Sequence, residues 1–110
     1  MKEINNKHRI LILGASGFIG QALYKELCGY FRTFGTYCRD NYAFNKNQHY
    51  FQYNIEEDDI FEILDIVKPT IVISAIRGNF SAQIIAHQHI TEYIIANNSK
   101  LIFLSSANVF

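Results

Sequence analysis

Three glycines within seven residues follow the first apolar run of the chain. Residues 10–13 read ILIL and residues 14–20 read GASGFIG, although the 110-residue sequence contains only six glycines. A short, wholly apolar run that ends in glycine is typical of a strand buried on both faces of a parallel sheet. We therefore expect the glycines to form a tight turn at the end of that strand.

An amphipathic helix is predicted directly after the glycines. Ile19, Leu23 and Leu27 recur every four residues with polar residues between them, and Gly29 is expected to end the helix. The N-terminus of a helix presents N–H groups without intrahelical partners and the positive end of the helix dipole. A strand, a glycine-rich turn and a helix in this order therefore predict an anion-binding site.

Each glycine of the turn has a predicted role in binding the pyrophosphate of a dinucleotide. Gly14 lets the chain leave the sheet sharply, Gly17 has no Cβ to block the pyrophosphate, and Gly20 lets the helix pack close to the strand. The other candidate cofactor-binding residues of the turn are Ser16, with a hydroxyl donor, Phe18 and Ile19. The alternative is that the glycines only make a tight turn between strand and helix.

The rest of the chain alternates between predicted strands and predicted helices. Strands are expected at residues 33–38, 50–53, 70–75 and 101–104, with one helix after the third strand and another over residues 80–97. This alternation indicates a parallel sheet with right-handed crossovers. The predicted fold class is α/β, a Rossmann-like doubly wound parallel sheet of five strands in the order 3-2-1-4-5 with helices on both faces.

The two later helices have predicted boundaries and predicted buried faces. Asn54, with Glu57 three residues later, is expected to cap the first of them, and Pro69 is expected to end it. Its predicted buried stripe consists of Ile60, Phe61, Ile63, Leu64 and Val67. In the helix over residues 80–97, the residues expected to point inward are Ile84, Ile85, Ile94 and Ile95.

Composition argues against several classes of function. Ten basic residues balance ten acidic ones, so no electrostatic footprint for nucleic acid or an anionic membrane is expected. No stretch approaches the ~20 apolar residues of a membrane span, and the polar N-terminus is unlike a signal peptide. Cys28 and Cys38 match no metal or redox spacing, and His87 and His89 cannot share one helical face, so no metal site is expected. We predict a soluble, cytoplasmic protein with reduced thiols.

The spacing of the glycines, GxxGxxG, resembles the cofactor loop of the extended short-chain dehydrogenase/reductases, the NAD-dependent epimerase/dehydratase family. Three later stretches are similar to the second, fourth and fifth strands of that family: FGTYCR, KPTIVISA and LIFLSSANVF. The final SSANVF is similar to the segment that carries the family's catalytic hydroxyl, and it is most like the dTDP-4-dehydrorhamnose reductase branch. The resemblance covers only the N-terminal half of such an enzyme. Residues 1–110 are therefore expected to form its dinucleotide-binding domain, without the substrate-binding domain.

The resemblance implies a nicotinamide cofactor and indicates which one. Members that prefer NAD usually end the second strand with an acid that binds the ribose hydroxyls. Cys38 stands at that position and Arg39 follows it, and an arginine can pair with a 2′-phosphate through its planar guanidinium, which favours NADP. Asp40 keeps NAD open as the alternative, and Arg39 and Asp40 could also be an ordinary solvated pair.

Further site residues are implied by the same resemblance. Asn54 and Ile55 stand where the family binds the adenine, and Ala75 and Ile76 stand where its backbone borders the cofactor. Ser106 is the implied catalytic residue. Its hydroxyl would hold the reacting group of the substrate while a tyrosine transfers the proton.

The family's Tyr-x-x-x-Lys pair belongs to a helix after the fifth strand and is not found at that place in this chain. The one match, Tyr42 to Lys46, lies in the predicted loop after the second strand, and we interpret it as coincidence. The resemblance implies the NAD(P)-binding domain of a reductase or epimerase that acts on a nucleotide-linked sugar and is inactive alone. The alternatives are a non-catalytic NAD(P)-binding sensor or subunit and a domain for another phosphate ligand. Whether the protein forms a homo-oligomer is left open by the sequence.

Overall fold

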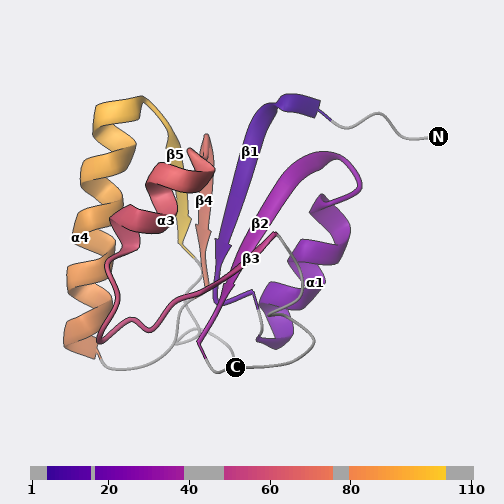
Figure 1. Cartoon of the computed structure of the whole chain (residues 1–110). Helices are drawn as coiled ribbons and strands as arrows, with labels where there is room; N and C mark the ends of the chain where they lie inside the picture. Colours follow the sequence, from indigo (N-terminus) through magenta and orange to yellow (C-terminus); the bar gives the residue numbers. More distant parts are fainter. Residues whose placement is uncertain (1–4, 16, 39–48, 76–79, 104–110) are drawn as a thin grey trace.

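The computed structural model describes residues 5–15, 17–38, 49–75 and 80–103, which form one parallel sheet with helices on both faces (Figure 1). The elements are β1 (Asn5–Leu13), α1 (Phe18–Leu27), β2 (Phe31–Tyr37), β3 (Tyr50–Gln52), α3 (Ile60–Val67), β4 (Ile71–Ser74), α4 (Phe80–Asn97) and β5 (Lys100–Phe103). The strands lie in the order β3-β2-β1-β4-β5, and every neighbouring pair is parallel. The predicted fold class and strand order are confirmed.

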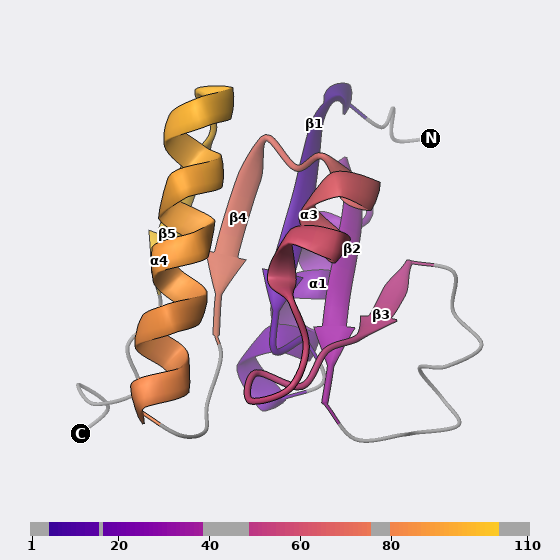
Figure 2. The same ribbon diagram turned by 60° about the vertical axis from the view of Figure 1, so that its left-hand side comes forward.

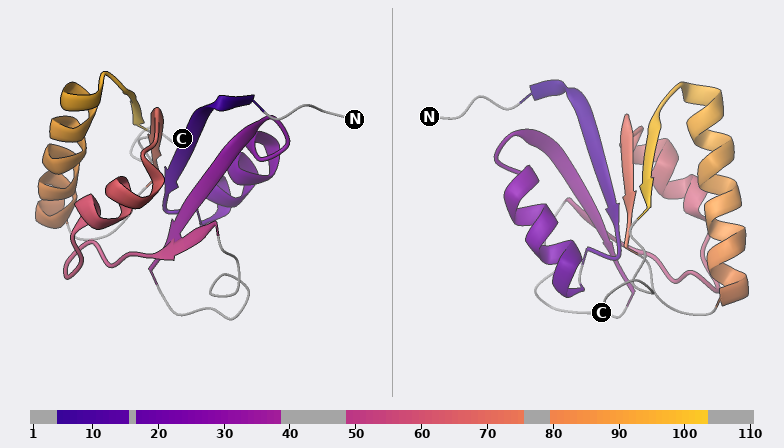
Figure 3. Two further views of the ribbon diagram at one scale, coloured as in Figure 1. Left: turned by 45° about the horizontal axis from the view of Figure 1, so that its top comes forward. Right: turned by 180° about the vertical axis from the view of Figure 1, so that it is seen from behind.

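The central strand β1 divides the core into two layers. Leu11 and Leu13 belong to the larger apolar cluster, which includes residues of α3 and α4, whereas Ile10 and Ile12 belong to the smaller cluster beside α1. Figure 2 brings α3 and α4 to the front of the sheet, and Figure 3 shows α1 on the opposite face. The four residues are all buried because both faces of β1 are covered, which explains why this run is apolar throughout.

Helix α1 differs from its prediction near its start. Ile19 is exposed, and the side of the helix that packs toward the sheet is formed by Leu23, Tyr24 and Leu27. The helix ends directly before Gly29, as predicted: Cys28 is its C-cap and donates its backbone N–H to the Tyr24 carbonyl at 2.9 Å. Within the described residues, Gly14 is the glycine with a positive φ, so Gly29 does not end the helix in a left-handed conformation.

Helix α3 begins later than predicted. Its N-cap is Asp59, whose carboxylate accepts a hydrogen bond from the Phe61 N–H at 2.9 Å. The predicted cap, Asn54, instead stabilises a separate turn, where its side-chain oxygen accepts from the Glu56 N–H at 2.9 Å. Asp59 takes the role because it directly precedes the apolar stripe. That stripe is confirmed, with Phe61 half-buried and Ile60, Ile63, Leu64 and Val67 buried. The helix ends before Pro69, as predicted.

Helix α4 has the predicted length but buries a different face. Three of the four isoleucines expected inside are exposed: Ile84, Ile85 and Ile95. Ala86, Ile90 and Tyr93 are buried instead, and Ile94 is half-buried against the larger cluster. Spacings of four and three residues place 86, 90 and 93 on one side of a helix. Within the described part of the chain, no helix is both long enough and apolar enough to cross a membrane.

Candidate dinucleotide-binding site

Gly14 makes the turn between β1 and α1. Its φ of 79° lies in the left-handed region, which a residue with a Cβ rarely adopts. Its carbonyl accepts a hydrogen bond from the Gly17 N–H at 3.1 Å, and its own N–H donates to the Thr36 hydroxyl oxygen at 2.9 Å. The peptide groups on both sides of Gly14 are therefore fixed by the fold.

Gly20 lies where the first turn of α1 touches the glycine turn. A Cβ placed there would lie 2.3 Å from the Gly14 carbonyl oxygen and 2.7 Å from the Ala15 Cα. Both are backbone atoms, which cannot rotate away as the end of a side chain can. The close packing of helix on turn therefore requires glycine at position 20.

Gly17 is the N-cap of α1, and the fold makes no such demand on it. Its φ of −74° and ψ of 172° are extended values that any residue adopts, and it is exposed. A Cβ at this position would meet the Gly14 carbonyl oxygen at 3.4 Å, an ordinary van der Waals contact. A side chain would instead occupy the space in front of the helix N-terminus.

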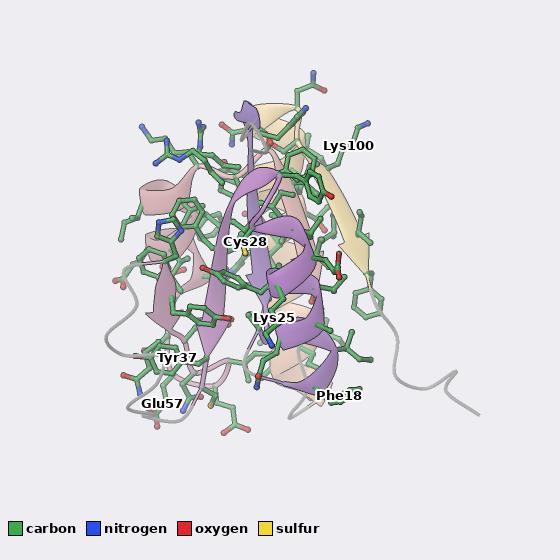
Figure 4. The ribbon with its side chains drawn as sticks, turned by 90° about the vertical axis from the view of Figure 1, so that its right-hand side faces the viewer. Phe18, Lys25, Cys28, Tyr37, Glu57 and Lys100 are labelled. Carbon is green, nitrogen blue, oxygen red and sulfur yellow. The ribbon has the colours of Figure 1, made fainter. Side chains whose placement is uncertain are left out.

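The N-terminus of α1 has the electrostatics of an anion site. Its first turn contains no acidic residue, and its N-cap, Gly17, has no side chain that could cap it. Its leading N–H groups point out of the helix end with the positive end of the dipole. The Phe18 side chain is 92% exposed and, in Figure 4, lies at the outer end of α1. A phosphate group could approach the backbone here without meeting a carboxylate of the first turn.

The ends of the neighbouring strands meet at the same edge of the sheet. Ala75, directly after β4, donates its N–H to the Leu13 carbonyl at 2.9 Å, so it lies beside the start of the glycine turn. Cys38 directly follows β2 and is exposed. In doubly wound folds, ligands bind at this edge, beyond the carboxyl ends of the strands.

Asn54 and Ile55 follow β3 in an acidic segment. Besides its turn contact with Glu56, Asn54 donates its backbone N–H to the Asp58 carboxylate at 2.7 Å. Residues 56–59 are all carboxylic acids and all exposed. The negative charge of these acids disfavours a phosphate close to them. The side-chain oxygen of Asn54 keeps a second lone pair that can accept a hydrogen bond.

Four predicted site residues lie outside the described residues: Ser16, Arg39, Ile76 and Ser106. The same holds for the Tyr42 to Lys46 match. Their predicted roles remain predictions from the sequence.

Two residues of β2 contribute to the glycine turn and were not predicted. Thr36 binds the Gly14 N–H, and a Cβ at Gly35 would lie 2.5 Å from the Ala15 Cβ. The glycine in the middle of a strand was a usable signal, because it often marks a close approach of another backbone. Nothing in the sequence pattern identified Thr36.

His87, His89 and the two cysteines have separate surroundings. His87 lies within hydrogen-bond distance of the buried Ser74 hydroxyl (Nε2 to Oγ, 2.7 Å), and burial lowers the pKa of His87. His89 stacks on Phe61 with ring centroids 5.0 Å apart. Cys28 and Cys38 are exposed free thiols. Among the described residues, no three His, Cys, Asp or Glu side chains gather in a group that could hold a metal ion.

A five-stranded parallel sheet with a glycine turn between its central strand and the next helix defines a Rossmann-like α/β domain. Solved structures agree with this fold. The chain is similar to L-threonine 3-dehydrogenase from Trypanosoma brucei, with a TM-score of 0.75 and 17% identity over 94% of this chain and 38% of that one. It is also similar to a monomeric L-threonine 3-dehydrogenase from a metagenome in its apo form, with a TM-score of 0.68 and 21% identity over 92% and 37%.

These likenesses establish the fold, and the chain spans less than two fifths of the length of both structures. No protein-family model and no curated protein sequence matches the chain. Neither similar structure is a dTDP-4-dehydrorhamnose reductase, so that branch stays a prediction from the sequence.

Proposed function

We propose that this chain is the dinucleotide-binding domain of an NAD(P)-dependent oxidoreductase or epimerase. The observation that carries the proposal is Gly17, because the fold has room for a Cβ at that position and yet the residue is glycine. A missing side chain at the N-terminus of the first helix is what the close approach of a pyrophosphate requires. Two of the similar structures are dehydrogenases, which supports the same class.

In the proposal, the cofactor lies along the carboxyl edge of the sheet. In this proposal the pyrophosphate lies against the N-H groups at the start of α1, between Gly17 and Ile19, with the Ser16 hydroxyl as a further donor. The backbone of Ala75 and Ile76 borders the cofactor next to β1. Asn54 and Ile55 face the adenine in this proposal.

For the choice of cofactor, we propose NADP and assign the preference to Arg39. A guanidinium beside the ribose makes charge-assisted hydrogen bonds to a 2′-phosphate. NAD remains the alternative, in which Asp40 binds the ribose hydroxyls. Both residues lie outside the described part of the chain, so this proposal is supported by the sequence.

When bound, the nicotinamide would accept or supply a hydride. The Ser106 hydroxyl would hold the reacting oxygen of the substrate, as the family resemblance implies. A nucleotide-linked sugar is the substrate class that this resemblance supports, whereas both similar structures are dehydrogenases of L-threonine. The alternative is a non-catalytic sensor or subunit. It would be favoured if the full natural protein bound NADP or NAD but did not oxidise or reduce any substrate.

The test is a calorimetric titration of the chain with NADP+ and with NAD+. The variant Gly17→Val places a branched side chain in front of the helix N-terminus and should abolish binding of both while the protein stays folded. Ala22→Val adds a comparable branched side chain to an exposed position five residues further along the chain, within α1, and should bind as the parent does. Unchanged affinity in Gly17→Val, or no binding by the parent, would overturn the proposal.

A further inference from the structure

Strand β2 contacts the glycine turn through two adjacent residues. The backbone ladder between β1 and β2 has Ile12 and Gly35 as its last pair. The next free donor of the turn, the Gly14 N–H, is bound by a side chain, the Thr36 hydroxyl oxygen at 2.9 Å. Thr36 is only 2% exposed. Water is therefore a poor substitute for this acceptor.

Gly35 provides the room that the turn needs. Ala15 is fully buried over β2, and a Cβ at Gly35 would come within 2.5 Å of its side chain and 3.2 Å of the Tyr50 ring. A larger residue at position 35 would push Ala15, and the turn with it, away from the sheet. Gly35 and Thr36 thus fix the turn by shape and by a hydrogen bond.

The Gly14 carbonyl shows why this matters for the site. It accepts from the Gly17 N–H at 3.1 Å and lies against the Cα side of Gly20. A rotation about the backbone bonds of Gly14 would move this carbonyl relative to the Gly14 N–H and disturb both contacts, and with them the direction of the N–H groups at the start of α1. A hydrogen bond to the Gly14 N–H limits that rotation from the far side of the turn.

From these contacts we infer that Thr36 and Gly35 of the second strand are positioning residues of the cofactor turn, with the Thr36 hydroxyl holding it in the conformation that receives the pyrophosphate. The part of this inference that concerns the ligand rests on the proposed function. The part that concerns the turn stands on the hydrogen bond and the packing alone.

The experiment compares Thr36→Val, which keeps the shape and removes the acceptor, with Thr36→Ser, which keeps the acceptor. The matched control is Thr33→Val, because Thr33 is the other buried threonine of β2 and its hydroxyl donates to the Phe31 carbonyl at 3.1 Å, away from the turn. Hydrogen exchange of the Gly14 amide is measured by NMR. NADP+ and NAD+ are titrated, and thermal unfolding is recorded for each variant.

Thr36→Val should speed exchange of the Gly14 amide and weaken NADP+ or NAD+ binding, each by about tenfold, since a buried N–H loses its acceptor. Thr36→Ser should restore both values, and Thr33→Val should lower the melting temperature without changing either. Parent-like exchange and affinity in Thr36→Val, or equal losses in Thr33→Val, would overturn the inference.

Failure of the proposed function gives a different result. If the parent binds neither NADP+ nor NAD+, the proposed function fails, and exchange of the Gly14 amide in Thr36→Val alone decides whether Thr36 positions the turn. If the Thr36→Val variant does not fold, hydrogen exchange of the Gly14 amide in the parent protein tests the inference instead. A Gly14 amide protected from exchange supports the hydrogen bond, and an unprotected one overturns it.

Discussion

Replacing Gly20 with alanine should destabilise the fold, because the added methyl group has no space. The Cβ would lie 2.3 Å from the Gly14 carbonyl oxygen, 2.7 Å from the Ala15 Cα and 3.0 Å from the Gly14 carbonyl carbon. All three are backbone atoms of a turn that is already fixed by hydrogen bonds to Gly17 and Thr36. The helix must therefore move away from the turn to admit the new atom.

Two opposing effects set the size of the loss. Overpacking a well-packed site costs about 1–3 kcal/mol of the free energy of unfolding, and a clash with backbone belongs near the upper end. Alanine in place of glycine within a helix gains about 1 kcal/mol. The net loss is therefore about 2 kcal/mol, which lowers the melting temperature of a domain of this size by about 8 °C.

The matched variant is Gly17→Ala, three residues earlier in the same turn. Its Cβ would make a 3.4 Å contact, so only the weaker capping ability of alanine counts against it, less than about 1 kcal/mol. Thermal unfolding followed by circular dichroism compares the two variants with the parent. A Gly20→Ala protein whose melting temperature equals that of Gly17→Ala, or exceeds that of the parent, would refute the steric reasoning.

Three further predictions concern a helix cap, a half-buried histidine and the cofactor. Asp59→Ala removes the N-cap of α3 and should lower the free energy of unfolding by about 1 kcal/mol in urea titrations, with Asn54→Ala as a control that leaves α3 capped. Burial lowers the pKa of His87 below its usual 6.5, so the unfolded chain takes up a proton first and stability should fall as the pH drops through about 6.5. His87→Gln should flatten that part of the profile of unfolding free energy against pH, and an unchanged profile would contradict the assignment. Arg39→Ala should weaken NADP+ binding roughly ten- to a hundredfold in calorimetry and leave NAD+ binding unchanged, whereas an equal loss for both cofactors would remove Arg39 as the cause.

The sheet was predicted well because the burial of a strand is visible in the pattern of its own few residues. A strand covered on both faces needs an apolar residue at every position, and residues 10–13 are apolar throughout and buried throughout. Helix faces are harder when apolar residues surround the helix. In α4 the four isoleucines expected inside point in several directions, whereas the buried side is formed by Ala86, Ile90 and Tyr93.

The candidate site was predicted where its requirements are local and missed where they are not. The spacing of Gly14, Gly17 and Gly20 is visible within seven residues. The contact between Gly14 and Thr36 joins residues 22 positions apart, and it exists only because β1 and β2 are neighbours whose backbone ladder ends at this point. No local pattern distinguishes this threonine from Thr33, which is equally buried but bonds within its own strand.

A glycine-rich turn is evidence for a ligand only to the extent that the fold does not itself demand the glycines. Gly14 has a left-handed backbone, and Gly20 and Gly35 have backbone or side-chain atoms within 2.5 Å of where a Cβ would lie, so folding alone accounts for these three. They would be glycine in a domain that binds nothing. Gly17 has an ordinary backbone conformation and an ordinary contact distance, and it faces the positive end of a helix. The difference between the tight-turn explanation and the cofactor explanation is thus concentrated in one residue, which is why the binding assay with Gly17→Val is the decisive measurement for this protein.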